Sequence, residues 1–517
     1  MIEVIIFLRP SIGLGLLAPK LPEDEEDSLF TSRRVLMVLV LILLVLVPIL
    51  QSSEEKYIDS NTIRNVTLLS ASTETMPGVS GFSPNVLLST DDSSYPHHVE
   101  VSMAISDNGT LFAGWKESNT HNGPGIRVSV TKSVDGGNTW SSPYNMPMFT
   151  SGTTGQSDPW LVWHDGTIYY TYLEYSIAGP SLSQITVARS DNYGASWTPA
   201  TASYGDFFAD KEMTVISNNE TIYVVYDDTD DATIIGNTTI RLTRSTDGGM
   251  TFQEICNITE QTPWKGLPYM ALNSEDHLYV VWLYLEPETL AWGNIELSKS
   301  LDGGNTFQES QFINDDGNYS TSAPGKITLP VVRFDQDDRL YVLWADGFDQ
   351  GENSFDVYLR YSDDFGATWS DRLRVNPTVQ GNQWNPEMAI DKHGRLHIIY
   401  YDEQGEYYRP YYRTITFVGD ERDSPIFSNP IPIADSTTSS SFTRPGEYMS
   451  IQLDSDQVPH IVWSDGRNNE MDIYYAHGIY ESSVSLDPTI ILTGTAIFVV
   501  AGIVLYIRRR QRVNLAS

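Results

Sequence analysis

The sequence predicts an all-β fold, a seven-bladed β-propeller, and three observations support that prediction. An eight-residue phrase of the form Ser-x-Asp-x-Gly-x-Thr-Trp recurs five times, with its serines 55 to 62 residues apart. A β-rich run that ends in an aromatic residue recurs seven times, each time between two further strand-like runs. The chain holds 29 Tyr, 12 Trp and 37 Gly, which suits many short strands joined by tight turns. A near-fixed period of this length indicates a repeat architecture, and four strands per period describe propeller blades.

The chain begins with residues 1–53, which we expect to direct the rest of the chain out of the cytoplasm. Residues 35–50 form an unbroken apolar run behind Arg33 and Arg34, the pattern of a signal peptide or a short signal anchor. The acidic stretch 23–27 lies upstream and is unusual for a signal. Cleavage therefore stays open, and a start site assigned too far upstream would also explain the stretch. Residues 54–81 are expected to be a linker.

The predicted propeller covers residues 82–480, and the repeated phrase supplies its hairpin turns. An Asp or Asn in such a turn accepts hydrogen bonds from nearby backbone amides, and the Gly adopts the positive φ that the turn needs. The closing aromatic then re-enters a strand and buries its apolar face. We expect a structural role for the acidic or amide position of each phrase, which is occupied by Asp135, Asn192, Asp247, Asp302 and Asp364.

This phrase resembles the Asp box, or BNR repeat, of the sialidase superfamily, whose members are β-propellers. The resemblance covers residues 133–369. It implies the fold more firmly than any function, because one fold hosts many chemistries. Sialidases have six blades, so a six-bladed ring with one divergent extra unit is the alternative to seven.

The seventh unit ends near Tyr480 without a fourth strand of its own. Residues 82–89, upstream of the first unit, have the pattern of a fourth strand without a hairpin partner. We predict that this segment pairs with the last blade and closes the ring, which removes an open sheet edge.

A carboxylate recurs two positions after the aromatic residue of the second strand in six of the seven units. The spacing of two places the aromatic and the carboxylate on the same strand face. Each carboxylate either accepts hydrogen bonds from the loop that follows or belongs to an acidic ring at one mouth of the propeller, able to bind a cation or a basic ligand. The six are Glu117, Glu174, Asp228, Asp346, Asp402 and Asp465.

Further polar groups stand at the starts of the first strands and are expected at one face of the propeller. They include Asp158, Asp210, Lys211, Glu212, Glu387 and Glu447. Trp264 and Trp384, in the same places, either stack on sugar rings or pack between blades. The acidic run Asp227, Asp228, Asp230 and Asp231 offers hard oxygen ligands for Ca²⁺, or is a solvated loop. No cofactor is required by the sequence; Ca²⁺ is the one candidate.

The resemblance also implies what a sialidase would need: an arginine triad, a tyrosine nucleophile with its glutamate, and an aspartate acid/base. Where the first arginine is expected, this chain has Val99-Glu100-Val101, and a Glu would repel a sialic acid carboxylate. Tyr448, with Glu447 and Arg444 nearby, lies near the place of the nucleophile and forms the candidate catalytic set.

After a short stalk at 481–488, residues 489–507 are uncharged and long enough to cross a bilayer. The tail 508–517 contains four arginines, which favours the cytoplasmic side. We therefore expect a cell-membrane protein whose bulk lies outside the cytoplasm. A buried core helix is the alternative for 489–507.

The net charge of −35 makes nucleic acid an improbable partner, because an acidic surface repels phosphates. The sequence favours a non-catalytic module that binds or adheres to a cell-surface glycan or protein. Ordinary glycoside hydrolysis is the alternative, since many acids line the expected face. A structural surface-layer component is a further alternative.

Overall fold

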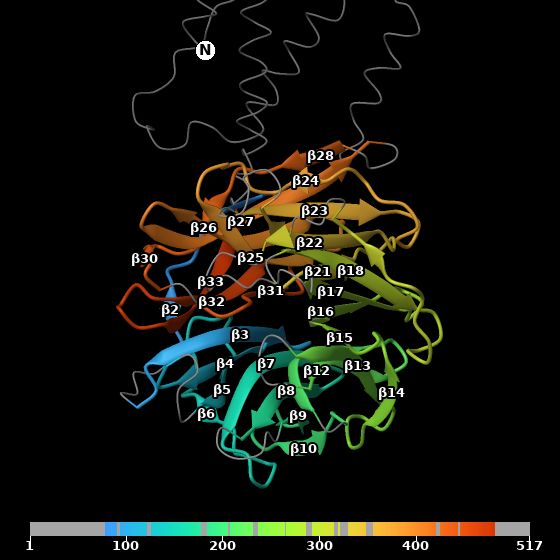
Figure 1. Ribbon diagram of the computed structural model, residues 1–517. Helices are drawn as coiled ribbons and strands as arrows, with labels where there is room; N and C mark the ends of the chain where they lie inside the picture. The colour runs from blue at the N-terminus through green and yellow to red at the C-terminus, as the bar shows by residue number, and fades with distance from the viewer. Residues whose placement is uncertain are drawn as a thin grey trace, which may run out of the picture. The chain divides into compact units, whose positions relative to one another are not determined.

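A computed structural model describes residues 78–89, 94–120, 126–176, 183–204, 207–230, 236–263, 265–285, 292–314, 319–320, 329–347, 355–419, 424–442 and 445–480. These residues form seven antiparallel sheets that follow one another along the chain (Figure 1). The chain is therefore a seven-bladed β-propeller, as predicted, and the six-bladed alternative does not apply. Among the described residues, no helix has the length and apolar character needed to cross a membrane. The predicted membrane segments, 35–50 and 489–507, lie outside the described residues.

The first four blades begin with β3, β7, β11 and β16. Blade 1 contains β3 (His97–Ile105), β4 (Leu111–Ser118), β5 (Arg127–Ser133) and β6 (Tyr144–Asn145). Blade 2 contains β7 (Gly155–His164), β8 (Thr167–Tyr175), β9 (Ser183–Ser190) and β10 (Thr198–Thr201). Blade 3 contains β11 (Phe208–Ile216), β12 (Ile222–Thr229), β13 (Asn237–Ser245), β14 (Gln253–Asn257) and β15 (Thr262–Pro263). Blade 4 contains β16 (Lys265–Leu272), β17 (Leu278–Leu285), β18 (Trp292–Ser300), β19 (Gln311–Phe312) and β20 (Tyr319–Ser320).

The last three blades begin with β21, β25 and β31. Blade 5 contains β21 (Val331–Phe334), β22 (Leu340–Asp346), β23 (Asp356–Ser362) and β24 (Leu373–Arg374). Blade 6 contains β25 (Asn382–Ile390), β26 (Leu396–Gln404), β27 (Tyr407–Val418), β28 (Ser424–Phe427), β29 (Ile431–Pro432) and β30 (Thr438–Ser439). Blade 7 contains β31 (Ser450–Leu453), β32 (Pro459–Asp465) and β33 (Asp472–Tyr480), completed by β1 (Val79–Phe82) and β2 (Val86–Leu87).

The first strand of each blade contacts the first strands of both neighbouring blades, so these seven inner strands line a closed ring. The predicted second strands carry the aromatic residues that pack between blades. Trp115, Trp282, Trp344 and Trp463 are each less than 2% exposed. Because the indole rings are large and apolar, their burial holds the blades together.

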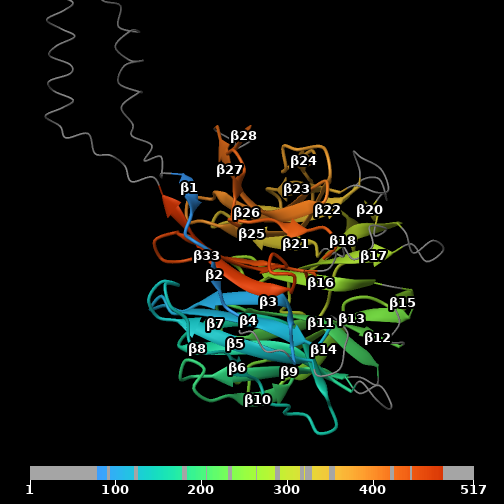
Figure 2. The ribbon, with the colours of Figure 1, turned by 90° about the vertical axis from the view of Figure 1, so that its left-hand side faces the viewer.

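The N-terminal segment closes the ring, as predicted for residues 82–89, but the closing strand β1 begins at Val79, within the expected linker 54–81. Val79 pairs with Tyr480 and Val86 pairs with Tyr475, so β1 and β2 both lie along β33 (Figure 2). The blade without a fourth strand of its own thus receives one from the start of the propeller, and β33 is left without an unpaired edge there.

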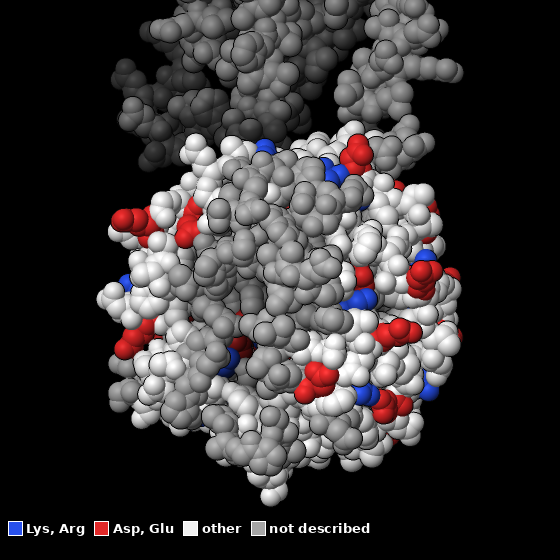
Figure 3. All heavy atoms as spheres, viewed as in Figure 1, with Lys and Arg blue, Asp and Glu red and all other residues white. Residues whose placement is uncertain are grey.

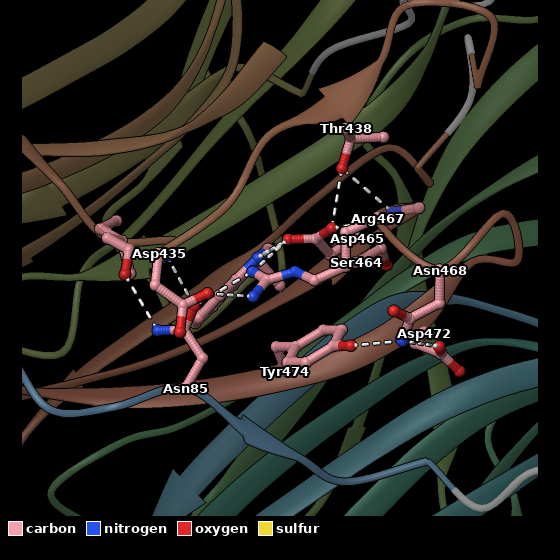
Figure 4. A network of polar contacts seen from close by, with 12 residues as sticks. Asn85, Asp435, Thr438, Ser464, Asp465, Arg467, Asn468, Asp472 and Tyr474 are labelled. Carbon is pink, nitrogen blue, oxygen red and sulfur yellow. Dashed lines mark hydrogen bonds and ion pairs between the residues drawn. The ribbon is translucent and has the colours of Figure 1, made fainter. Parts of the chain in front are cut away.

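A polar network ties this closure to the last two blades, and Figure 4 shows its side chains pointing toward one another. Arg467 donates to Asp465 at 2.6 Å and to Asn85 at 3.0 Å, and it also pairs with Asp435. Asn85 in turn donates to the carbonyl of Ile433 at 3.1 Å. The Arg467 guanidinium therefore joins the N-terminal segment, blade 6 and blade 7.

The repeated phrase forms the turn that its residues predict. In the first copy, the Gly137 amide donates to Ser133 Oγ at 2.9 Å. The amide and the hydroxyl of Thr139 donate to the two oxygens of Asp135 at 2.9 and 2.6 Å. Gly137 has φ 89°, the conformation for which Gly is needed. The other copies repeat these contacts, with Asn192 in place of the Asp in the second.

These turns predict a defined dependence of stability on pH. Hydrogen bonds from the Thr139 hydroxyl and amide lower the pKa of Asp135 to about 2, and the corresponding threonines do the same for Asp247 and Asp302. A carboxyl with a depressed folded-state pKa stabilises the fold above its unfolded pKa, and that contribution is lost as the pH falls from about 4 toward 2. We expect the triple Asp→Asn variant at these positions to melt at a lower temperature at pH 6 but to lose less between pH 4 and 2.

Thermal unfolding in buffers from pH 6 to pH 2 measures this difference. Asn192→Asp is the matched control, because it adds a carboxylate to the one turn that lacks it. It should steepen the acid-side decline. Parallel curves for the wild type and the triple variant would contradict the prediction.

Candidate functional site

Several of the inner strands that surround the central channel share a distortion near their starts. Five of them have a break in register near their starts, and each break contains a residue with positive φ. A bulge of this kind re-aims a side chain, and positive φ is uncommon outside Gly. The five residues are Glu100 (φ 57°), Asp158 (φ 54°), Lys211 (φ 53°), Leu267 (φ 58°) and Asn385 (φ 47°).

Three carboxylates meet in the channel, and we call them the central carboxylate cluster. Glu100, Asp158 and Glu447 each place one oxygen within 4.8 Å of the others, and all three residues are buried. Glu100 comes from β3 and Asp158 from β7, whereas Glu447 precedes β31. Residues 58 to 347 positions apart in the sequence thus come together only through closure of the ring.

Two lysines neutralise part of this charge. Lys116 Nζ lies 3.0 Å from Glu100 Oε1. Lys211 Nζ lies 2.5 Å from Asp158 Oδ1 and 3.7 Å from Glu447 Oε2. Glu100 Oε2 also accepts from Ser157 Oγ at 3.2 Å. The cluster is therefore built as an internal ion network, in which each carboxylate lies near an ammonium group or accepts hydrogen bonds.

Burial perturbs the titration of this region. Burial, followed by the charge of Asp158, raises the pKa of Glu100 to about 7, against the lowering effect of Lys116. Burial also raises the pKa of Asp210 to about 6, although Lys211 lowers it. The pKa of Glu212 lies well above its ordinary value because of burial and then the charge of Asp158. Removing carboxylates from water disfavours their charged form, and neighbouring acids add to that effect.

A small cavity adjoins the cluster and has room for about one water molecule. Its wall is partly aromatic: the Trp160 ring lies edge-on to Tyr269 at 5.6 Å and to Tyr448 at 6.1 Å between centroids. The Tyr448 hydroxyl donates to the Pro159 carbonyl at 3.3 Å. The lining residues are Asp158, Trp160, Lys211, Glu212, Met213, Pro268, Tyr269, Leu329 and Tyr448.

A second ionic group reaches across the ring beside this cavity. The Tyr269 hydroxyl lies 3.0 and 3.1 Å from the two Glu387 oxygens, and Arg333 Nη2 lies 3.3 Å from Glu387 Oε1. Arg333 also donates to the Tyr269 hydroxyl. On the described inner strands, Arg333 is the single arginine.

The recurring carboxylates of the second strands are buried and engaged within their own blades. Glu117 accepts from Arg127 at 2.8 Å, and Glu174 accepts from the amides of Phe149 and Thr150 at 2.9 and 2.8 Å. Arg241 Nε lies 2.6 Å from Asp228 Oδ2.

The remaining three follow the same pattern. Asp346 accepts from Trp344 Nε1 at 2.6 Å. Asp402 accepts from Gln383 and Gln404 at 2.8 and 2.7 Å. Asp465 accepts from Trp463 Nε1 at 3.1 Å and from Arg467. These contacts are those of the structural alternative, in which each carboxylate accepts hydrogen bonds from nearby protein groups.

Among the described residues, the remaining candidates, the tryptophan and the acidic run, do not form a common site. The Trp384 ring is 1% exposed and packs against Tyr401 and Tyr408, so it belongs to blade packing and offers no face to a sugar. The acidic run also divides, because successive strand residues point to opposite faces. Asp227 accepts from the Leu267 amide at 3.1 Å, whereas Asp230 accepts from Asn237. Asp231, Trp264 and Arg444 lie outside the described residues.

Sequence reasoning placed Asp158, Lys211, Glu212 and Glu447 at the starts of first strands, and the structure brings these four together around the cavity and the cluster. It missed the contribution of Glu100 and Lys116. Glu100, Asp158 and Lys211 occupy equivalent places in the structure, because each is the positive-φ residue in the register break of its inner strand.

No family model matches the chain, and the search of curated proteins also finds no match. Among solved structures, a protein of unknown function from Dyadobacter fermentans is 17% identical, with a TM-score of 0.46 over 63% of this chain and 96% of that one. The GH93 α-L-arabinofuranosidase of Fusarium graminearum is 13% identical, with a TM-score of 0.47 over 77% and 98%. Trypanosoma rangeli sialidase is 11% identical, with a TM-score of 0.43 over 64% and 57%. The propeller architecture itself is established by the strand pairing described above.

Proposed function

We propose that this chain is a membrane-anchored, extracytoplasmic propeller that binds a cell-surface glycan or protein and does not transform it. The observation that carries the proposal is that the centre of the propeller combines lysine-paired carboxylates with a very small cavity. Its carboxylates are partly neutralised by Lys116 and Lys211, and the cavity beside them holds about one water molecule. An enzyme of this architecture needs a pocket of several hundred Å³ for its substrate.

The arginine content supports the same conclusion. The resemblance to sialidases would require three convergent arginines, and the described inner strands carry Arg333 alone, held by Glu387 and Tyr269. Glu100 stands where the first arginine is expected, and it is 1% exposed among other acids. A sialic acid carboxylate would therefore meet a negative site.

The surface suits a neutral or basic partner. The chain has a net charge of −35. On the described part of the face in Figure 3, acidic and basic side chains lie interspersed without one dominant patch. Recognition of a glycan through hydrogen bonds and of a protein through scattered ion pairs both fit such a surface. The apolar segment 489–507 and the basic tail 508–517 would hold the propeller at the membrane.

One observation favours a second candidate, a glycoside hydrolase. Glu212 is a buried carboxyl whose pKa lies well above its usual value because of burial and the charge of Asp158, and it lines the same cavity as Tyr448. Pairs of carboxyl groups in unlike environments are the arrangement with which glycosidases divide acid and nucleophile roles.

A single set of measurements on the purified full-length chain separates these functions. We expect saturable binding to members of a glycan array or to a surface protein, and no turnover of sialosides or aryl glycosides above the blank. Glu212→Gln and Tyr448→Phe should leave that binding unchanged, with Asp346→Asn as the control at a carboxylate of the blade interior. Turnover that disappears in the first two variants and persists in the control would replace binding with hydrolysis. Where residues 35–50 are cleaved as a signal peptide, removal of residues 489–517 should release the chain from the membrane fraction.

A further inference from the structure

The spacing of the central carboxylate cluster matches the ligand shell of a single cation. Glu100, Asp158 and Glu447 offer oxygens within 4.8 Å of one another. Oxygen ligands of Ca²⁺ lie at about 2.3–2.6 Å from the ion, so two ligands of one ion are at most about 5 Å apart. Glu100 and Asp158 lie on the inner strands of two blades and Glu447 lies just before the inner strand of a third, which favours a preformed site.

A second, independent feature points to the same place. Glu212 on β11 is 4% exposed, and neither of its carboxylate oxygens has a hydrogen-bond partner among the described residues. It lines the water-sized cavity together with Asp158. A buried carboxylate without a partner is costly, and a bound ion would satisfy it. A cavity of this size accepts a bare ion or a water molecule and nothing larger.

The charges of the region leave room for a cation. Four carboxylates, those of Glu212 and the central carboxylate cluster, face two ammonium groups. Lys116 is buried against Glu100, whereas the Lys211 side chain, which contacts Asp158 and Glu447, is 16% exposed. Lys211 is therefore the group that can withdraw when a stronger cation enters.

We propose that Glu100, Asp158 and Glu447 bind Ca²⁺ at the centre of the propeller, with Glu212 facing the ion from the adjoining cavity and the Lys211 ammonium competing with the ion. The donor set consists of carboxylate oxygens, which are hard ligands and suit Ca²⁺ rather than softer metals. Mg²⁺ retains several waters in proteins, and the cavity has space for about one. The site joins blades 1, 2, 3 and 7 and is distinct from the acidic run at 227–231.

The test uses the full-length chain stripped with a chelator and titrated with Ca²⁺ by calorimetry. A dissociation constant of about 10⁻⁴ to 10⁻³ M is expected, as in other extracellular calcium modules. Saturating Ca²⁺ should raise the melting temperature by about 5 °C. Tb³⁺ provides a local probe, because excitation of Trp160 at the cavity should sensitise its emission, and Trp160→Phe should dim that emission without changing Ca²⁺ affinity.

Single-residue variants distinguish Ca²⁺ binding at the central carboxylate cluster from nonspecific Ca²⁺ binding to other acidic residues. Asp158→Asn and Glu447→Gln should each weaken Ca²⁺ binding at least tenfold, while Asp230→Asn, at an exposed residue of the acidic run, should leave it unchanged. Lys211→Gln removes the competitor. It should bind Ca²⁺ about tenfold more tightly and regain with Ca²⁺ the melting temperature that it loses without the ion.

Two results would overturn the proposal. The first is loss of binding in Asp230→Asn but not in Asp158→Asn, which would place the ion in the acidic run. The second is a Lys211→Gln protein that neither binds Ca²⁺ nor is stabilised by it, which would leave the lysine as the cluster's permanent counter-ion. The second measurement remains decisive even if the carboxylate variants do not fold.

Discussion

Gly446→Ala is expected to lower the free energy of unfolding by about 3–5 kcal/mol, one of the two largest single-residue effects that we predict. Gly446 has φ 97°, and an added Cβ would lie 2.6 Å from the Glu100 amide nitrogen and 3.1 Å from its Cα. The Gly446 carbonyl accepts from Asn385 Nδ2 at 2.7 Å, which anchors the segment against moving away. Backbone atoms on β3 cannot yield as a flexible side chain would.

The matched control is Gly419→Ala. Gly419 has a similar φ of 104°, but a Cβ there would meet nothing within 4 Å. Gly419→Ala should lower the free energy of unfolding by about 1–2 kcal/mol, from backbone strain alone. Urea unfolding followed by tryptophan fluorescence measures both variants. Equal losses would show that strain, and not the contact with Glu100, accounts for the effect at Gly446.

Arg467→Ala is expected to cost about 3–5 kcal/mol and to loosen ring closure before the rest of the fold. The guanidinium is 11% exposed, and its loss leaves the buried Asp465 carboxylate without its cationic partner. It also removes the link from Asp465 to Asn85, which holds the N-terminal segment (Figure 4).

Hydrogen exchange of the amides in β1, with urea unfolding of the whole chain, checks this expectation. β1 should lose protection more than the strands of blade 4. Arg189→Ala is the control, because Arg189 lies 3.9 Å from an Asp191 that is 74% exposed, and such pairs contribute about 1 kcal/mol or less. Uniform loss of protection across all blades would show that Arg467 stabilises the fold globally and not its closure.

The fold could be predicted from the sequence because each blade carries a recognisable local sequence pattern. The repeated phrase, the second-strand aromatics and the unpaired segment 82–89 are local signals, and they sufficed for seven blades and for closure by the N-terminal segment. Period-two spacing also placed the six recurring carboxylates on one strand face. The spacing could not reveal that side chains such as Arg127 and Arg241 would pair with these carboxylates.

The site was harder to predict because its contacts cross the ring. Tyr269 meets Glu387 across 118 positions, and Ser157 meets Glu100 across a blade boundary. A repeat gives the position of a residue within its blade but not the identity of the side chain opposite. The start of a first strand was a sufficient signal for Asp158 and Lys211. The bulge that aims Glu100 beside them is a backbone feature without a sequence motif of its own.

The pairing of Val79 with Tyr480 has a mechanical consequence. The chain enters and leaves the propeller at the same end of one antiparallel ladder, so tension that separates the two ends would unzip β1 from β33 one hydrogen bond at a time. If both ends are tethered to one membrane, they are pulled in the same direction and the ladder is not peeled. A load from a bound ligand then reaches the tethers through both strands together. The β1–β33 ladder therefore opens readily when its two ends are pulled apart, and it resists when both ends are pulled in the same direction.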